Sequence, residues 1–221
     1  MGKKAPRWER RKEERPEEIL DAALEAFAAK GFAATKMDEV AARAGVTKGT
    51  VYLYFKTKED LFKELVRTKL VANIAALEAA ATAPASAADM LQRFLRIWGE
   101  RVMTSKVSVL PKLIISEAGN FPELAAFYLQ EVIYRGLALV RSLVNRGIEE
   151  GAFRPVDAEH AVFCIIGPLL LSAIWRHSFE RHDVKPLDVH ALGNAHLDLL
   201  LHGLLKPNGR AKDHASALVP L

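Results

Sequence analysis

The sequence predicts an all-α protein in which a small N-terminal domain of three helices precedes a larger helical domain. Apolar residues recur every three or four positions through almost every segment, which is the spacing of a helix with one buried face. Gly and Pro residues stand between these segments, and no segment alternates apolar and polar residues as a strand does. With 221 residues, half of them hydrophobic, the chain is long enough for one or two domains with substantial cores.

The first predicted helix runs from about Pro16 to Gly31. Proline suits the first turn of a helix, and glycine readily adopts the conformation that ends one. The apolar stripe of this helix contains Ile19, Leu20, Ala23, Leu24 and Phe27. Phe32 follows the helix, where its ring can cover a small core.

Two short helices joined by a glycine turn come next. Thr35 stands three residues before Asp38, which is the spacing of a capping box, so we expect the second helix to start here. Gly45 ends that helix, and Thr47 caps the third. A helix, a short turn with glycine and a second helix form the motif that enters the major groove of DNA.

The third helix is expected to show one face to DNA. Val51 and Phe55 lie four residues apart and face the core. Lys48 suits a phosphate or a guanine, and Thr50 suits a thymine methyl group or a base edge. The candidate DNA-binding residues are Thr35, Lys36, Thr47, Lys48, Gly49, Thr50, Tyr52, Tyr54 and Lys58. For either tyrosine, packing on the core with a solvated hydroxyl is the alternative.

A fourth helix begins after Thr57, which again has an acid, Asp60, at the capping-box position. It extends to about Ala81 and is long enough to reach into the second domain. The segment TAPASA at 82–87 is the clearest break. We expect further helices near 88–104, 107–118, 122–150, 157–181 and 186–205, with Pro111 interrupting or starting one, Pro122 and Pro186 opening two, and Gly151 closing one.

The run 161–175 is apolar almost all round, so a helix that contains it must be covered on every side. It is shorter than the ~20 residues that span a bilayer, and Gly167 and Pro168 interrupt it, so we expect no membrane partner. A second copy of the chain is the simplest cover, and burial as a core helix of a monomer is the alternative. The candidate dimer interface comprises Ile165, Ile166, Leu169, Leu170, Leu197, Leu200, Leu201 and Leu204.

Residues from about Pro16 to Leu70 resemble the DNA-binding region of the TetR/AcrR family of bacterial transcriptional regulators. The matching residues are Thr35, the turn AARAGV at 41–46, Thr47, Lys48, Gly49, Thr50, Tyr52, Tyr54, Phe55 and KEDL at 58–61. The rest of the chain agrees with the family in length and helical pattern only. The resemblance implies a homodimer formed by the last two helices, DNA contacts at the positions above, and a pocket for a small molecule.

These observations divide the chain into a basic arm (1–15), a TetR-type helix-turn-helix DNA-binding domain (16–73), a helical effector-binding and dimerisation domain (74–206) and a disordered tail (207–221). The formal excess of +4 charges lies within residues 1–69. The arm either follows DNA phosphates and enters the minor groove, or is a solvated tail. The single cysteine, Cys164, and the charged N-terminus without an apolar segment indicate a cytoplasmic protein.

Motifs of catalysis are absent from the sequence, including G-x-S-x-G, the P-loop and H-E-x-x-H, so we expect no enzyme and no cofactor. The histidines are scattered, and consecutive ones do not share a helix face, so we expect no metal site. A neutral helical domain suits a pocket between helices for a lipophilic or aromatic effector. The candidate lining residues are Trp98, Met103, Phe127, Tyr128, Phe163 and Trp175, each with core packing as the alternative.

The sequence therefore predicts a dimeric regulator that binds a palindromic site in double-stranded DNA. By resemblance it is a repressor that a small-molecule effector releases from its operator, and activation of transcription is the alternative. We expect the dimer to have two states, with the fourth helix as the lever between them. The alternative is a helix-turn-helix protein whose C-terminal domain serves only dimerisation or protein interaction.

Overall fold

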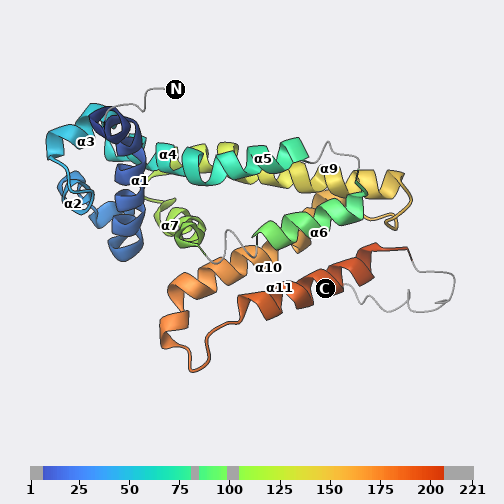
Figure 1. Ribbon diagram of the computed structural model, residues 1–221. Coiled ribbons are helices and arrows are strands. Elements are labelled where there is room, and N and C mark those ends of the chain that lie inside the picture. The colour runs from blue at the N-terminus through green and yellow to red at the C-terminus, as the bar shows by residue number, and fades with distance from the viewer. Residues whose placement is uncertain (1–6, 81–84, 99–104, 207–221) are drawn as a thin grey trace.

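The computed structural model describes residues 7–80, 85–98 and 105–206, and the predicted all-α fold is confirmed. Every regular element in these ranges is helical, and the β-bridging there is limited to an isolated antiparallel bridge between Phe153 and Leu205. The helical head formed by α1–α3 lies at one end, and the remaining helices extend from it (Figure 1). The predicted tail at 207–221 lies outside the described residues.

The head consists of α1 (Arg7–Ala34), α2 (Met37–Arg43) and α3 (Lys48–Tyr54). The predicted start of α1 at Pro16 is wrong, because Pro16 lies inside the helix. Gly31 breaks α1 as predicted, with a φ of +83° that side-chain-bearing residues rarely adopt. Residues 7–14 belong to this helix, so the predicted arm at 1–15 is helical in its described part.

Helix caps test the predicted boundaries. The capping box of Thr35 and Asp38 is wrong, because Lys36 precedes α2 and caps it with no side-chain hydrogen bond. The predicted helix caps Thr47 and Thr57 are confirmed, since their hydroxyl oxygens accept from the backbone N–H of Thr50 and Asp60, respectively. The left-handed turn at Gly45, with a φ of +64°, is also as predicted.

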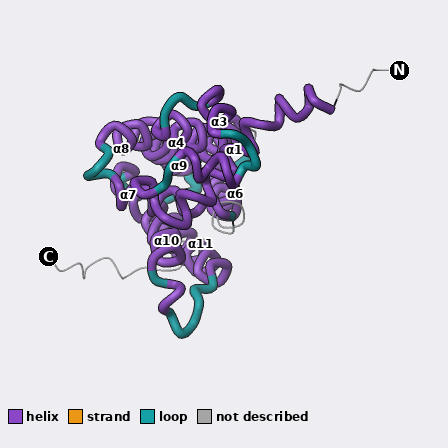
Figure 2. The backbone as a smooth tube through the Cα atoms, turned by 90° about the vertical axis from the view of Figure 1, so that its left-hand side faces the viewer, coloured by secondary structure: helices purple, strands orange, loops and turns teal. Residues whose placement is uncertain are grey.

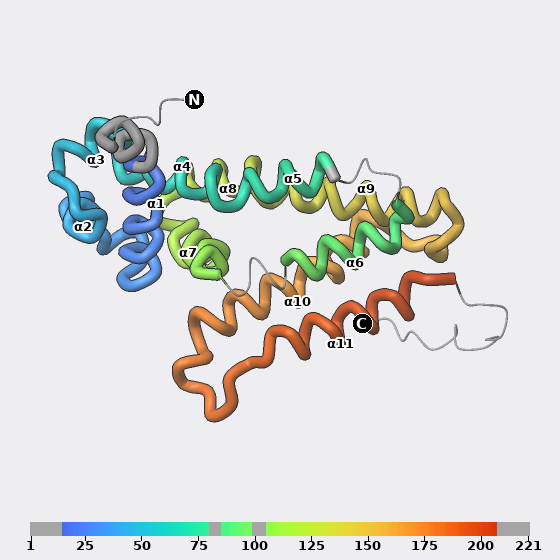
Figure 3. The backbone as a smooth tube through the Cα atoms, in the orientation of Figure 1, coloured from blue at the N-terminus to red at the C-terminus, as the bar shows by residue number. Residues whose placement is uncertain are grey.

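Two long helical runs leave the head together. The first comprises α4 (Lys58–Val66), a π-helical turn at Arg67–Val71 and α5 (Ala72–Ala80), as the sequence predicted for 58–81. The second comprises α8 (Pro122–Tyr128), a π-helical turn at Leu129–Tyr134 and α9 (Arg135–Glu149), with Pro122 in its first turn. The two runs lie side by side (Figure 3), and their π-helical turns are in contact.

The other described helices are α6 (Ala87–Ile97), α7 (Val109–Glu117), α10 (Ala158–Ser178) and α11 (Val189–Leu204). Helices α10 and α11 are neighbours joined by a loop at the far tip of the molecule (Figure 2). Pro186 does not open α11, because Asp188 caps it through the N–H groups of His190 and Ala191. Pro111 lies within the first turn of α7, where proline does not interrupt a helix.

Helix α10 corrects a further expectation. Gly167 and Pro168 do not interrupt it, because one helix of 21 residues continues through Pro168. By length and composition alone it qualifies as a candidate membrane span, with a mean hydropathy of 1.6 over 18 residues, 28% of them buried. A core helix of a soluble protein also meets this criterion.

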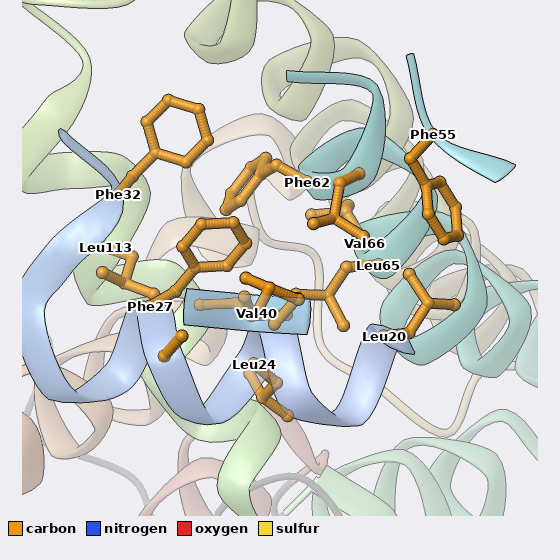
Figure 4. Packing of buried hydrophobic residues seen from close by; sticks show 14 of the residues in the cluster. Leu20, Leu24, Phe27, Phe32, Val40, Phe55, Phe62, Leu65, Val66 and Leu113 are labelled. Carbon is orange, nitrogen blue, oxygen red and sulfur yellow. The ribbon is translucent and has the colours of Figure 1, made fainter. Parts of the chain in front are cut away.

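The buried residues form two hydrophobic clusters. The first joins α1–α4 to α7 and α8, and its centre is a group of aromatic rings (Figure 4). Phe32 lies 5.3 Å from Phe27, 5.4 Å from Phe62 and 4.8 Å from Phe121, measured between ring centroids. The second cluster joins α6, α9, α10 and α11. The core of the head therefore continues past residue 73 into a segment that the sequence placed in the second domain.

Gly147 of α9 gives a test of the second cluster. A methyl group at this position would overlap the ring of Phe153, which is fully buried. We expect Gly147→Ala to lower the free energy of unfolding by about 1–3 kcal/mol, the usual cost of overpacking. Chemical denaturation measures this change.

The matched control is Gly136→Ala in the same helix, where an added methyl group meets no atom within 4 Å. It should raise the free energy of unfolding by up to about 1 kcal/mol, because alanine is the better helix former. Equal effects of the two substitutions would contradict the packing at Phe153.

Candidate nucleic-acid interface

Helix α3 is held to the head by one face. Val51 is fully buried and Phe55, just after the helix, is almost so. Because residues on a helix advance by 100° each, residues on the side away from these two anchors must turn outward. The outer face of α3 is formed by the exposed residues Lys48, Gly49, Tyr52 and Leu53, with Thr47 fixing the start of the helix.

Lys48 and Tyr52 dominate the polar part of that face. The Lys48 ammonium lies 2.8 Å from Asp38 Oδ1 of α2 and 5.9 Å from the centre of the Tyr52 ring. The hydrogen bond to Asp38 and its negative charge raise the pKa of Lys48. The lysine is therefore charged, exposed and held at the junction of the two helices.

The other candidates fall into three groups. Lys36, Thr47 and Gly49 are exposed, and Thr50 is half-buried beside Thr47, with 2.9 Å between their hydroxyl oxygens. Tyr54 is also half-buried and packs against the first hydrophobic cluster, as its alternative interpretation required. Two further candidates, the buried Thr35 and the half-buried Lys58, use their polar groups within the protein.

Thr35 is 2% exposed. Its hydroxyl donates to the carbonyl of Gly31 at 2.7 Å and also lies 3.2 Å from the carbonyl of Ala26. A buried hydroxyl that satisfies the end of α1 has no surface to offer to DNA. The predicted DNA contact is therefore wrong for the Thr35 side chain.

Lys58 has a similar internal role. Its ammonium donates to the carbonyls of Phe32, Ala33 and Thr35 at 2.8, 3.0 and 3.0 Å, and lies 4.5 Å from the centre of the Phe32 ring. Burial lowers the pKa of Lys58. An ammonium has three donors, and all three are used here, so the predicted phosphate contact is wrong for this geometry.

The predicted effector residues do not converge on one pocket. Tyr128 belongs to the first cluster, where burial raises its pKa, and Trp98 packs against the second. Phe127 packs beside Lys63 and Arg67. Phe163 and Trp175 are exposed, on α10, and Met103 lies outside the described residues. The set is wrong as a single pocket, because it spans two cores and an outer surface.

The cavities lie elsewhere. A space of about 20 Å³ between α6, α10 and α11 is lined by Leu95, Pro168, Leu169, Ser172, Val189, Leu192, Gly193 and His196. The sequence pattern did not assign any of these residues to a pocket, because each belongs to an ordinary apolar stripe or its polar edge. A recess of about 570 Å³ between α1 and α2 is lined largely by charged side chains of both signs. Neither space has the shape or lining of a ready lipophilic pocket.

The predicted dimer interface is wrong in part. Ile165, Leu169 and Leu204 are buried inside the second cluster, so they are not available to another chain. Ile166, Leu170, Leu197, Leu200 and Leu201 are half-buried. The large apolar side chains that the described part of α10 and α11 exposes are Phe163, Leu171, Trp175 and Leu199.

A helix-turn-helix whose second helix is seated by one face and presents Lys, Thr and Tyr on the other defines a DNA-binding protein. Residues 19–65 match the family model described as bacterial regulatory proteins, tetR family. The chain is 32% identical over 152 residues to the HTH-type transcriptional regulator YhgD of Bacillus subtilis, covering 67% of this chain and 76% of that protein. The chain belongs to the TetR family of bacterial transcriptional regulators, which confirms the resemblance.

Two solved structures are similar over most of the chain. The regulator FadR of Bacillus subtilis in complex with stearoyl-CoA has a TM-score of 0.71 and 27% identity, over 85% of this chain and 98% of that one. The ketosteroid regulator KstR2 of Mycobacterium tuberculosis has a TM-score of 0.69 and 26% identity, over 87% of this chain and 95% of that one.

Lys58 and Lys48 provide a matched pair of substitutions. Lys58→Met leaves three carbonyls without their charged donor, and we expect it to lower the free energy of unfolding by about 2 kcal/mol. It should leave unchanged the slope of log affinity for DNA against log salt concentration. Lys48→Met should have the opposite pattern, with unchanged stability and a slope reduced by about 1.

Thermal or denaturant unfolding and DNA binding at several salt concentrations measure both quantities. If the Lys58→Met protein keeps full stability and shows a reduced salt slope, Lys58 contacts a DNA phosphate after all, and the internal role assigned to it is contradicted.

Proposed function

We propose that this regulator is a homodimeric repressor that binds a palindromic operator and is released from it by a lipophilic effector. The observation that carries the proposal is the apolar outer face of α10 and α11, which belongs to the same chain as the exposed face of α3. Two such chains, related by a two-fold axis, would present two reading helices to one DNA duplex. The DNA contacts are assigned to Lys36, Thr47, Lys48, Gly49, Thr50 and Tyr52, while Tyr54 is assigned to packing on the first cluster.

The outer face of α10 has the periodicity of a helix seam. Phe163, Gly167, Leu171 and Trp175 stand four residues apart, and Phe163 and Leu171 are 62% and 59% exposed. Leu199 of the neighbouring α11 is 72% exposed. The opposite face of α10 already packs on the chain's own core through residues such as Val162 and Ile165. Exposed apolar patches of this kind mark interaction sites, and an equivalent patch on a second copy is a self-complementary cover.

The effector site is assigned to the second cluster, where α6, α10 and α11 surround the small cavity. The indole N–H of Trp98 is buried there without a hydrogen-bond partner among the described residues, and Trp98 stands one turn beyond Leu95 of the cavity wall. The names of the relatives, a fatty acid metabolism regulator and a ketosteroid regulator, support a lipophilic effector class. Such a molecule must widen the cavity and so displace α10 or α11.

Helix α7 offers a route from this site to the head. It packs on α10 and on α1. Glu117 at the C-terminal end of α7 accepts from the N–H of Ala33 at 3.1 Å. Lys106, which precedes the first residue of α7, pairs with Glu25 of α1 at 2.5 Å. A displacement of α10 would therefore reach α1 through α7, in addition to any movement of the α4–α5 lever. An effector acts only by binding one of the two arrangements better than the other.

The second candidate function is a DNA-binding dimer whose C-terminal domain has no small-molecule effector. The small volume of the cavity, about 20 Å³, favours it, since this space is about the size of one water molecule. The two candidates differ in one observable, which is the response of the protein–operator complex to lipophilic molecules.

The dimer is tested by introducing a charge into the apolar face. Leu171→Asp buries a carboxylate in the proposed interface, so we expect the protein to sediment as a monomer at micromolar concentration. Ile115→Asp is the control, because Ile115 of α7 is similarly exposed, at 53%, but lies outside the α10–α11 face. It should remain dimeric.

The operator is tested by selecting bound sequences from a random duplex pool with the wild type and with the Leu171→Asp and Ile115→Asp proteins. The dimeric protein should enrich an inverted repeat with half-sites about 34–36 Å apart or a multiple of this. A dimeric Leu171→Asp protein, or enrichment of unrepeated sites by the wild type, would contradict the proposed arrangement.

The α7 route is tested with Glu117→Ala, and stearoyl-CoA is the probe. The substitution removes the acceptor of the Ala33 N–H, so this amide should exchange with solvent faster than in the wild type. The factor by which stearoyl-CoA weakens operator binding should fall towards one, while operator affinity without the probe changes less.

Glu123→Ala, an exposed acidic position on α8, should alter neither quantity. Unchanged exchange at Ala33 would contradict the role of Glu117. No response of the wild type to stearoyl-CoA, stearate or a ketosteroid would favour the second candidate function.

A further inference from the structure

The outer face of α3 carries a large apolar side chain that the helix-turn-helix pattern alone did not identify. Leu53 is 76% exposed, whereas Val51, two residues earlier, is fully buried. Leu53 does not belong to the apolar side chains that pack on the first cluster, although its neighbour Tyr54 does. It therefore projects from α3 on the side away from the head.

The sequence around Leu53 explains this exposure. A helical side chain leans towards the N-terminus and covers the turn that precedes it. The residue one turn before Leu53 is Gly49, which has no side chain, and an atom added there would meet only the Thr47 hydroxyl at 3.8 Å. Thr50, three residues before Leu53, lies on the same side of the helix. Gly49 and Leu53 together form an apolar surface beside the hydroxyl of Thr50.

We infer that Leu53 is a specificity-determining residue that recognises the C5-methyl group of thymine in the operator. The inference rests on the DNA-binding activity of the family and adds a base contact to it. An exposed isobutyl group contributes little to folding and gains only when a partner removes it from water. The major groove presents one apolar group for such a contact, the methyl group of thymine, and the other base edges there are polar.

The placement of polar groups supports this partner over a second protein. Lys48 and Tyr52 flank the apolar surface on the same short helix, and both suit phosphate or base edges. A protein-binding patch would instead gather several apolar side chains, as α10 does with Phe163, Leu171 and Trp175. Leu53 is a single apolar group within a polar, cationic surface.

The experiment replaces thymine by uracil, which differs from it by this methyl group alone. The wild-type protein is first used to select its preferred sequence from a random duplex pool. Each thymine of that sequence is then replaced by uracil, and affinity is measured at fixed salt concentration. We expect replacement of a single thymine, at one particular position of a half-site, to weaken binding about fourfold, the factor that one buried methyl group is worth.

The same thymine and uracil duplexes are then measured with the Leu53→Ala protein. It should bind the thymine and uracil versions of that position with equal affinity, and it should unfold at the temperature of the wild type because Leu53 is exposed. Val184→Ala is the matched control, since Val184 is a fully exposed apolar residue in the loop before α11. It should retain the wild-type preference for thymine.

The outcomes separate this inference from the proposed operator. A thymine preference that persists in Leu53→Ala, or that is lost only in Thr50→Ser, overturns the role of Leu53. Enrichment of a single half-site overturns the palindromic operator. The ratio of affinities for the thymine and uracil duplexes then still tests the Leu53 contact. If the wild type enriches no sequence, both the operator and the Leu53 contact are overturned.

Discussion

The position of α3 depends on how the chain is held where α1 ends. Gly31 breaks α1, and the next carbonyls, which a continuing helix would have bonded, point to one place. The Lys58 ammonium occupies that place and binds three of them, with the Phe32 ring against it. A charged donor that satisfies several partly buried carbonyls is costly to remove, because each then loses its partner in the protein. The first turn of α4 is thereby joined to the connection between α1 and α2.

The same corner is held from its other side by the second half of the chain. Glu117 of α7 accepts from Ala33, and Phe121 packs on Phe32. The head consequently shares one core with α7 and α8, and a second core begins near the paired π-helical turns. Turns of this kind often occur at functional positions in helices. The boundary between the two cores therefore lies at these turns and at the α7–α10 contact, and not at the end of the DNA-binding sequence motif.

Local signals in the sequence predicted most of the fold. Thr47, Thr57, Gly45 and Gly151 set helix boundaries through interactions within a few residues, so their spacing was informative. Thr35 has the spacing of a cap, but its hydroxyl turns back to the carbonyls of Gly31 and Ala26 in α1, and the spacing to Asp38 does not show which of the two directions the side chain takes. The ligand set failed for the same reason, since aromatic residues at helical spacing look alike in a core and in a pocket. The exposure of Leu53 likewise depends on how α3 is seated on the head.

Helix α10 illustrates a limit of a different kind. Its composition is apolar on all sides, so periodicity could not tell which residues the chain itself buries. The structure divides the helix into an inner face with Ile165 and Leu169 and an outer face with Phe163 and Leu171. The inner face packs on α7 and α9, and residues of α10 also line the small cavity. In the proposed dimer, the outer face of the same helix would contact the second chain. A displacement of α10 would then alter the cavity, the subunit contact and the α7 contact together, and this is the physical basis on which the proposed effector would change the spacing of two reading helices.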